Sequence, residues 1–241
     1  MGLMIEQGGP FDEYEAVALP PGPGPAGRSA GSAVFLRRSP RPSRRAVLHL
    51  HDLTSSFAPA DLARWYNERG FHFYVTDLDV REPLDAIGRR RTPQSLRACF
   101  AALDSACRHL RRADGIDAII LSAQDDAAPA AALWSHARRT VRPVDALILS
   151  NPDFGKGLRS RLDIACPVLV ISGSGQQGQS GAGRKARRGR AESVRLGQHV
   201  TWLYLDQGPA ADVPAGRKRL FDEMGRWLGA YMYGQVRDQL L

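Results

Sequence analysis

Short apolar runs alternate with helical patterns along most of this chain, and this alternation limits the possible fold more than any other feature. Most of the apolar runs lack polar alternation, which is typical of strands buried on both faces. The segments between them have the apolar spacing of helices. The pattern predicts the α/β class, a mainly parallel central sheet with helices on both faces. Strands are expected at residues 46–50, 71–77, 116–122, 144–150, 167–172 and 199–206, and helices at 58–68, 93–112, 127–139 and 215–233.

Two segments depart from this pattern. Residues 14–19 and 33–37 are strand-like runs separated by a proline- and glycine-rich stretch at 20–25, so an N-terminal antiparallel edge hairpin is expected. Residues 174–191 are rich in Gly, Ser, Gln and Arg and have no apolar period, which predicts a flexible basic insertion.

The length of the chain bears on the number of domains. A length of 241 residues is typical of a single α/β domain spanning residues 1–241.

Composition argues against several classes of protein. No apolar run approaches the ~18 residues needed to span a bilayer, and the N-terminus lacks the basic start and apolar stretch of a secretory signal. A cytoplasmic location is therefore expected.

The cysteines are not spaced for a disulfide or a zinc site. Cys99 and Cys107 lie eight positions apart on a predicted helix, about 12 Å, which is too far for a disulfide. Together with Cys166 they show no zinc-binding spacing, so we expect three reduced thiols, no metal and no cofactor.

The positive charge is concentrated in loops. The chain has a formal net charge of +8, and five of the cations belong to the Arg-rich segment 184–190, without which +3 remains. A second group of arginines lies between residues 37 and 45. Neither group has the aromatic residues that stack on bases or the pattern of a recognition helix. Segment 184–190 is therefore interpreted as a solvated loop, and nucleic acid is not expected as a partner.

The turn near residue 125 is the strongest candidate for a functional site. A buried strand at 119–123 and a helix beginning at Ala127 are joined by Gln124, Asp125 and Asp126. Hydrolases place a serine in this setting, in the pattern G-x-S-x-G. Here the outer positions, Ala123 and Ala127, are still small, while the central position holds a carboxylate. The geometry is expected to be retained and the chemistry to be changed.

Several further stretches carry a resemblance to a known family. They are residues 45–52 (RAVLHLHD), 61–63, 69–78, 131–136, 144–152, 196–202 and 226–228. Over nearly the whole length, the chain resembles α/β-hydrolases of the serine aminopeptidase and lysophospholipase-like group. The resemblance implies an α/β-hydrolase fold. Residues 159–166 leave little room for the family's cap, so a minimal cap or none is expected.

The resemblance also implies that the catalytic residues have been lost. Asp125 stands at the serine position, and Ala211 stands where the general base, a histidine, is expected. Glu192 is the only carboxylate in the region of the triad acid. The oxyanion-hole glycine after His51 is replaced by Asp52, whose carboxylate would repel an oxyanion. No catalytic residue is therefore assigned, and the remnant pocket is expected to be lined by His51, Asp52, Gln124, Asp125 and Asp126.

Three interpretations of the aspartates remain open. Asp125 can be a conformational fit, since aspartate tolerates positive φ, with Asp126 capping the next helix. Asp125 can instead be a nucleophile, as in the epoxide-hydrolase and dehalogenase branches of the fold, although that chemistry still needs a base. In the third interpretation, Asp52, Asp125 and Asp126, with His51, hold a cation through oxygen ligands.

The expected function follows from the combined losses. The chain is interpreted as a pseudoenzyme that binds a small acyl or ester-like ligand or a protein partner. The alternative is an active ester or acyl hydrolase with a rearranged site that uses Asp125. A third class, a basic interaction protein using the Arg-rich segment, predicts binding that weakens steeply with salt.

Overall fold

The computed structural model describes residues 15–18, 33–37, 39, 41–51, 59–77, 93–125, 127–152, 154, 161–173, 196–197, 199–205 and 214–233. The chain forms two compact units, Met1–Ile119 and Ile120–Leu241, and the boundary between them falls inside strand β5. The expected basic insertion at 174–191 lies outside the described residues. The assignment of residues 1–241 to one domain stays a prediction.

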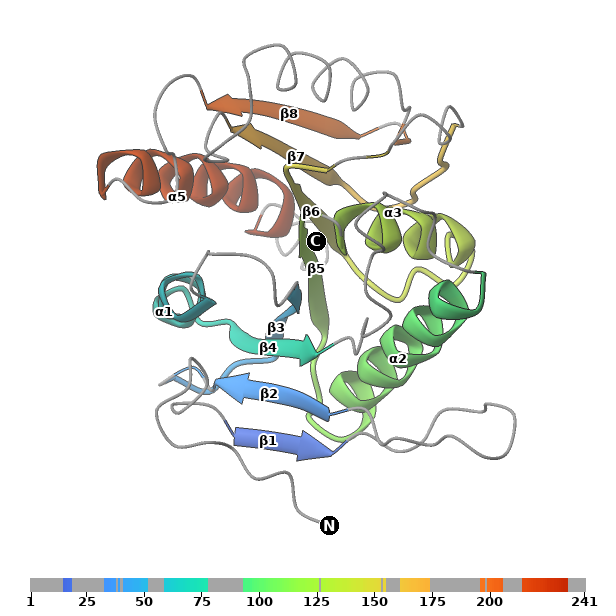
Figure 1. Cartoon of the computed structure of the whole chain (residues 1–241). Helices are drawn as coiled ribbons and strands as arrows, with labels where there is room; N and C mark the ends of the chain where they lie inside the picture. The colour runs from blue at the N-terminus through green and yellow to red at the C-terminus, as the bar shows by residue number, and fades with distance from the viewer. Residues whose placement is uncertain are drawn as a thin grey trace, which may run out of the picture. The chain divides into compact units, whose positions relative to one another are not determined.

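The first unit combines an antiparallel edge with a parallel pair of strands (Figure 1). The strands β1 (Glu15–Ala18), β2 (Ala33–Arg37), β3 (Arg45–His51) and β4 (His72–Asp77) lie in the order β1-β2-β4-β3. β1 and β2 are antiparallel, as are β2 and β4, whereas β3 and β4 are parallel. The predicted N-terminal antiparallel hairpin is therefore confirmed.

Helices α1 (Pro59–Glu68) and α2 (Pro93–Arg112) lie on opposite sides of this part of the sheet (Figure 1). The pleat of β4 explains how one strand serves both helices, because successive side chains point to opposite faces. Phe73 stacks on Tyr66 of α1, with ring centroids 5.8 Å apart. The next residue, Tyr74, donates a hydrogen bond from its hydroxyl to Asp114, just beyond α2, at 2.8 Å.

The second unit is wholly parallel in its strands. β5 (Ala118–Gln124), which begins in the first unit, is followed by β6 (Ala146–Ser150), β7 (Val168–Gly173) and β8 (Val200–Leu205). The strands lie in chain order, each parallel to the next. Helix α3 (Ala127–Ala137) packs against β6, and α5 (Pro214–Leu228) packs against β8 from the other side of the sheet (Figure 1). The prediction of a mainly parallel sheet with helices on both faces is confirmed.

The observed element boundaries depart from the expected ones in two informative places. The last helix was expected to run through residue 233, but the α-helix ends at Leu228 and residues Gly229–Tyr233 form a π-helical turn, η1. The change of hydrogen bonding begins at Gly229, and glycine is a weak helix former. α3 ends at Ala137, earlier than expected, because the Arg139 amide bonds to the nearer carbonyl of His136 at 3.2 Å, which tightens the last turn.

The cysteines and the hydropathy of the helices also bear on the expectations. Cys99, Cys107 and Cys166 are all buried and none forms a disulfide, which agrees with the expectation that Cys99 and Cys107 lie too far apart for a bridge. Among the described residues, no helix combines the length and the apolar character needed to cross a membrane.

Candidate functional site

The turn that follows β5 has the sharp strand-to-helix geometry expected from the sequence. β5 ends at Gln124, α3 begins at Ala127, and Asp125 between them has a φ of 47°, in the left-handed region. The Asp125 amide donates a hydrogen bond to the carbonyl oxygen of Ser150 at 2.8 Å. The Asp125 carbonyl accepts one from the amide of Ala128 at 3.2 Å. The expectation that aspartate holds an unusual backbone conformation here is confirmed.

Small side chains surround this turn. Ala123 and Ala128 are fully buried, and Ala127 is 4% exposed. These positions at the start of α3 are thus closely packed, so a longer side chain there would have to displace its neighbours. The alanine-rich sequence of α3 is what allows the helix to start so close to the end of β5.

The Asp125 side chain is half-buried and is held by its neighbour in sequence. The amide nitrogen Nε2 of Gln124 donates a hydrogen bond to Oδ2 of Asp125 at 3.1 Å. The amino-terminal end of α3 adds the partial positive charge of a helix N-terminus. An ionised carboxylate accepts hydrogen bonds and donates none. It can attack an electrophilic carbon or bind hydrogen-bond donors, but it has no proton for a base to remove.

A second left-handed residue, Asn151, lies at the end of the neighbouring strand. Asn151 also has a φ of 47°, and its amide donates a hydrogen bond to the carbonyl of Ile171 in β7 at 2.7 Å. Because Gln124 pairs with Ser150 in the parallel ladder, Asp125 and Asn151 follow paired residues on adjacent strands. β5 and β6 are therefore each followed by a left-handed polar residue, and these two residues occupy equivalent places at the carboxyl edge of the sheet.

Asn151 was not among the residues expected at the site. It was expected only as part of the stretch 144–152, which contains a predicted strand and its end. The available signal was an asparagine before a proline at the end of an apolar run, which favours a turn. That signal is local and contains no information about which strand lies alongside.

The structure describes only part of the predicted site. Gln124 and Asp125 are joined by the hydrogen bond described above. His51 is the last residue of β3 in the first unit, where it pairs with Asp77. Asp52, Asp126 and Ala211 lie outside the described residues, as does Glu192. The roles expected for these residues stay predictions.

The described histidines of the second unit lie away from the elbow. His136 is nine residues beyond the start of α3, about 14 Å along the helix axis. Its Nδ1 accepts a hydrogen bond from the amide of Asp163 at 2.9 Å. His199 immediately precedes β8, so it lies at the amino edge of the sheet, about 20 Å from the carboxyl edge. Neither histidine is within the hydrogen-bonding reach of about 3 Å that a general base needs.

Among the described residues, no group of three or more His, Cys, Asp or Glu side chains is arranged to hold a metal ion. The proposed cation site depends on Asp52 and Asp126, which the structure does not describe. It therefore stays an untested alternative.

No family model matches this chain, and no curated protein matches it in sequence. Solved structures do match. A dienelactone hydrolase from Anabaena variabilis has a TM-score of 0.63 and 14% identity, over 90% of this chain and 97% of that one. An esterase from Pyrococcus furiosus has a TM-score of 0.60 and 12% identity, over 91% and 93%. A serine hydrolase homologue from Coxiella burnetii has a TM-score of 0.55 and 17% identity, over 80% and 86%.

At these identities the similarity concerns the backbone arrangement. The serine aminopeptidase and lysophospholipase-like group expected from the sequence is one branch of the fold that these structures represent, and the branch stays a prediction. The mainly parallel sheet and the helices on both of its faces agree with the matched structures. This chain therefore has the α/β-hydrolase fold.

Proposed function

We propose that this chain is a non-catalytic protein of the α/β-hydrolase fold that binds a small ligand or a partner protein at the carboxyl edge of its sheet. One observation carries the proposal: the left-handed residue of the elbow, where a nucleophilic hydroxyl would stand, is Asp125. The replacement is accompanied in the sequence by Ala211 at the position of the base and Asp52 at the position of the oxyanion glycine. One such change can be compensated by a rearranged site, whereas three together remove the nucleophile, the base and part of the oxyanion hole.

The positions of the histidines support this proposal. An aspartate nucleophile still needs a base to activate the water that releases the intermediate. Within the described part of the second unit, His136 and His199 both lie at the far end of their elements from the elbow. A ligand at Asp125 would therefore be held by hydrogen bonds and charge, with no histidine of this set able to move a proton.

A second candidate function is an ester or acyl hydrolase that uses Asp125. The left-handed conformation of Asp125 favours it, because a nucleophile of this fold stands on a similarly sharp and strained turn between a strand and a helix. Several solved structures with the same fold are named as esterases or dienelactone hydrolases. In the hydrolase, the Asp125 carboxylate would form a covalent intermediate that water then releases. In the binding protein, it would only contact the ligand.

Hydrolysis of short- and medium-chain acyl esters by purified protein tests the proposal. Wild type, Asp125→Asn and Asp125→Ala are compared, with circular dichroism showing that each is folded. We expect no turnover above the spontaneous rate in any of the three. Asp222→Asn, an exposed change on α5, is the matched control for the loss of one negative charge.

Turnover by wild type and by Asp222→Asn that disappears in Asp125→Asn would contradict the proposal and support the hydrolase. Asparagine keeps the size and the backbone preference of aspartate but is a poor nucleophile, so loss of rate with retained stability would identify chemistry at the carboxylate. Turnover that survives in both Asp125 variants would reject both candidates and indicate another site.

A further inference from the structure

The amino-terminal edge of the first unit collects seven arginines that are far apart in the sequence. β3 and β4 are parallel and begin at this edge, and the helices that connect parallel strands end there. The arginines come from the loop before β3, from the end of α1 and from the last turns of α2. We call this group the arginine rim: Arg41, Arg44, Arg45, Arg69, Arg108, Arg111 and Arg112.

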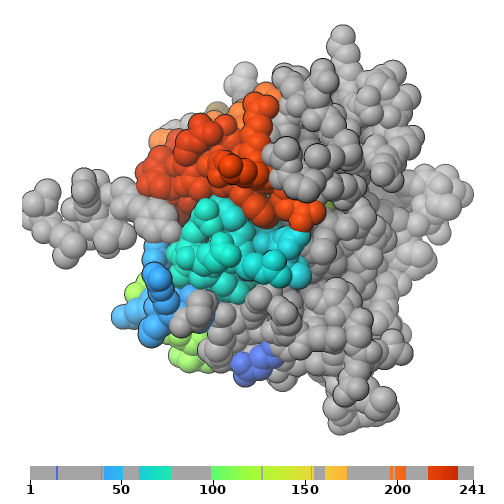
Figure 2. All heavy atoms as spheres, turned by 90° about the vertical axis from the view of Figure 1, so that its left-hand side faces the viewer, coloured from blue at the N-terminus to red at the C-terminus, as the bar shows by residue number. Residues whose placement is uncertain are grey.

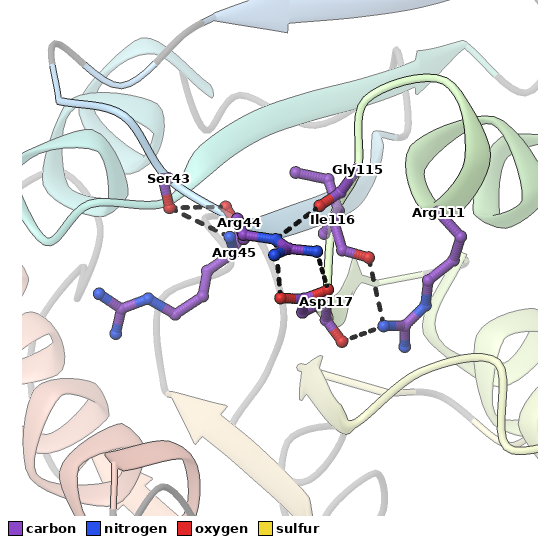
Figure 3. A network of polar contacts seen from close by, with 7 residues as sticks. All are labelled: Ser43, Arg44, Arg45, Arg111, Gly115, Ile116 and Asp117. Atoms are coloured by element: carbon purple, nitrogen blue, oxygen red, sulfur yellow. Dashed lines mark hydrogen bonds and ion pairs between the residues drawn. The ribbon is translucent and has the colours of Figure 1, made fainter.

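Part of the rim is fixed by a polar network around Asp117 (Figure 3). Nη2 of Arg44 donates to Oδ1 of Asp117 at 2.9 Å, and Nε of Arg44 lies 2.8 Å from Oδ2, which is the bidentate geometry. The Asp117 amide donates to the Arg44 carbonyl at 2.7 Å. Arg111 donates to the carbonyls of Ile116, at 3.3 Å, and Asp117. These contacts hold the end of α2 beside the start of β3.

A second set of contacts holds the end of α1 at the same edge. The Ser43 hydroxyl donates to the Gly70 carbonyl, and in Figure 2 the blue residues before β3 lie beside the cyan atoms of α1. The Arg45 guanidinium lies over the Phe71 ring at 5.1 Å, and that of Arg69 over the Trp65 ring at 4.1 Å. The loop before β3 thus links the ends of both helices, and the arginines of all three segments lie on one edge.

The carboxylates at this edge do not neutralise the rim. Asp117 is engaged by Arg44, Glu68 lies 4.0 Å from Arg69, and Asp114 accepts the Tyr74 hydroxyl and lies 3.6 Å from His109. Asp104, four positions before Arg108 on α2, adds a fourth carboxylate, so among the described residues the seven guanidinium groups leave three net positive charges. In the part of the chain that the structure describes, no ion pair is found for Arg41, Arg108 or Arg112, which are all exposed.

The exposed arginines are suited to an external anion. Arg108 and Arg112 are four positions apart on α2, so they project from the same side of the helix about 6 Å apart. The negative end of the α2 dipole offsets part of their mutual repulsion, which allows the two charges to lie close together without a carboxylate between them. Guanidinium forks bind phosphate oxygens in bidentate fashion.

We propose that the arginine rim binds the phosphate backbone of duplex nucleic acid without reading its sequence. Phosphate contacts supply most of the sequence-independent affinity of nucleic-acid-binding proteins. The expectation drawn from the sequence, that nucleic acid is not a partner, considered the arginines segment by segment. Folding brings Arg108 and Arg112 to the same edge as Arg41, a grouping that no single segment contains.

Two other occupants fit the rim less well. Among the described residues, Val141 is the one exposed large apolar side chain, and it belongs to the second unit. A protein partner usually needs buried aromatic or aliphatic anchors, which the described rim does not offer. Stable membrane attachment usually needs an inserted apolar or lipid group in addition to basic residues. A rigid array of phosphates needs neither.

Fluorescence anisotropy with a labelled duplex of about 20 base pairs tests the inference. If the three exposed arginines each meet one phosphate, the slope of log affinity against log salt is about −2.7, so binding weakens about 40-fold between about 50 and about 200 mM salt. In Arg108→Gln/Arg112→Gln we expect a loss of about tenfold in affinity at low salt and a shallower slope. Two duplexes of unrelated sequence should bind equally.

The matched control is Lys218→Gln/Arg219→Gln on α5, which removes the same two charges from exposed positions in the second unit. Its affinity should stay within about twofold of wild type. Equal losses in both double variants, wild-type binding by the rim variant, or no binding by the wild-type protein would each overturn the proposal. Rim-dependent binding to vesicles of anionic phospholipid without binding to the duplex would overturn it in favour of a membrane. None of these outcomes depends on whether Asp125 is catalytic.

Discussion

Gly197 shows how a single residue can be required by a contact from a distant segment. It has a φ of 107°, and a Cβ atom at this position would lie 2.6 Å from the carbonyl oxygen of Ile164. Gly197→Ala should therefore combine backbone strain with a clash against backbone, and we expect a loss of about 2 kcal/mol or more in the free energy of unfolding. Urea denaturation measures the loss.

Gly115→Ala separates the two causes. Gly115 also has a positive φ, 65°, but a Cβ there would meet no atom within 4 Å. Its loss should be about 1 kcal/mol, from backbone strain alone. Equal losses in the two variants would mean that the contact with Ile164 contributes nothing and that only the backbone conformation matters.

At the scale of elements, His136 attaches the end of α3 to the segment that leads into β7. The amide of Asp163 donates a hydrogen bond to His136 Nδ1 at 2.9 Å, so Nδ1 acts as the acceptor in this contact. His136→Ala should cost about 1 kcal/mol, because the Asp163 amide loses its partner. An asparagine oxygen can occupy the place of Nδ1, so His136→Asn should retain most of the stability in urea unfolding. Equal losses would show that the ring's packing, and not its acceptor, matters.

At the scale of the whole molecule, the cysteines report the unfolding of both units. Cys99 and Cys107 belong to the first unit and Cys166 to the second, and all are buried. Burial raises the pKa of Cys166 to about 12, and the nearby charge of Asp145 acts in the same direction. At pH 8 only about one in ten thousand Cys166 thiols would be ionised in the folded protein, so labelling should follow unfolding. We expect all three cysteines to become reactive at the urea concentration where circular dichroism changes, with mass spectrometry identifying each.

The raised pKa also predicts how stability depends on pH. The folded protein holds the Cys166 proton at pH values where the unfolded chain has lost it, so unfolding releases a proton between about pH 9 and pH 12. Stability should therefore fall as pH rises through this range and be unaffected by this thiol at lower pH. Cys166→Ala should make the decline shallower.

The labelling experiment has its own contrary outcome. Labelling of Cys166 at a lower urea concentration than Cys107 would show that the second unit unfolds before the first.

Much of the fold could be predicted because it depends on local patterns. Apolar runs such as 144–150 and helical spacing such as 93–112 are visible within a few turns of chain, and the observed β6 and α2 agree with them. The turn at Asp125 was also foreseen, since a strand, a polar turn and an alanine-rich helix adjoin in the sequence. The last turn of the C-terminal helix was not, because competition between α and π hydrogen bonding at Gly229 leaves no signal in the apolar period.

The candidate site was predicted less completely than the fold. Gln124 and Asp125 were identified because they adjoin in sequence, but Asn151 acquires its place only from the parallel pairing of β5 with β6. The arginine rim escaped prediction for the same reason. Its members from the loop before β3 and from α2 are more than sixty positions apart, and each segment alone resembles an ordinary solvated surface.

The sequence by itself determined the α/β class, the elements and the presence of an aspartate in the turn after β5, because these follow from side-chain periodicity and from neighbouring residues. Only the tertiary structure decided that Asp125 and Asn151 follow paired residues, that Gly197 lies against Ile164, and that the arginines of three segments share one edge. The physical reason is that strand pairing and helix packing join residues distant in the chain, and no local pattern specifies which of them meet.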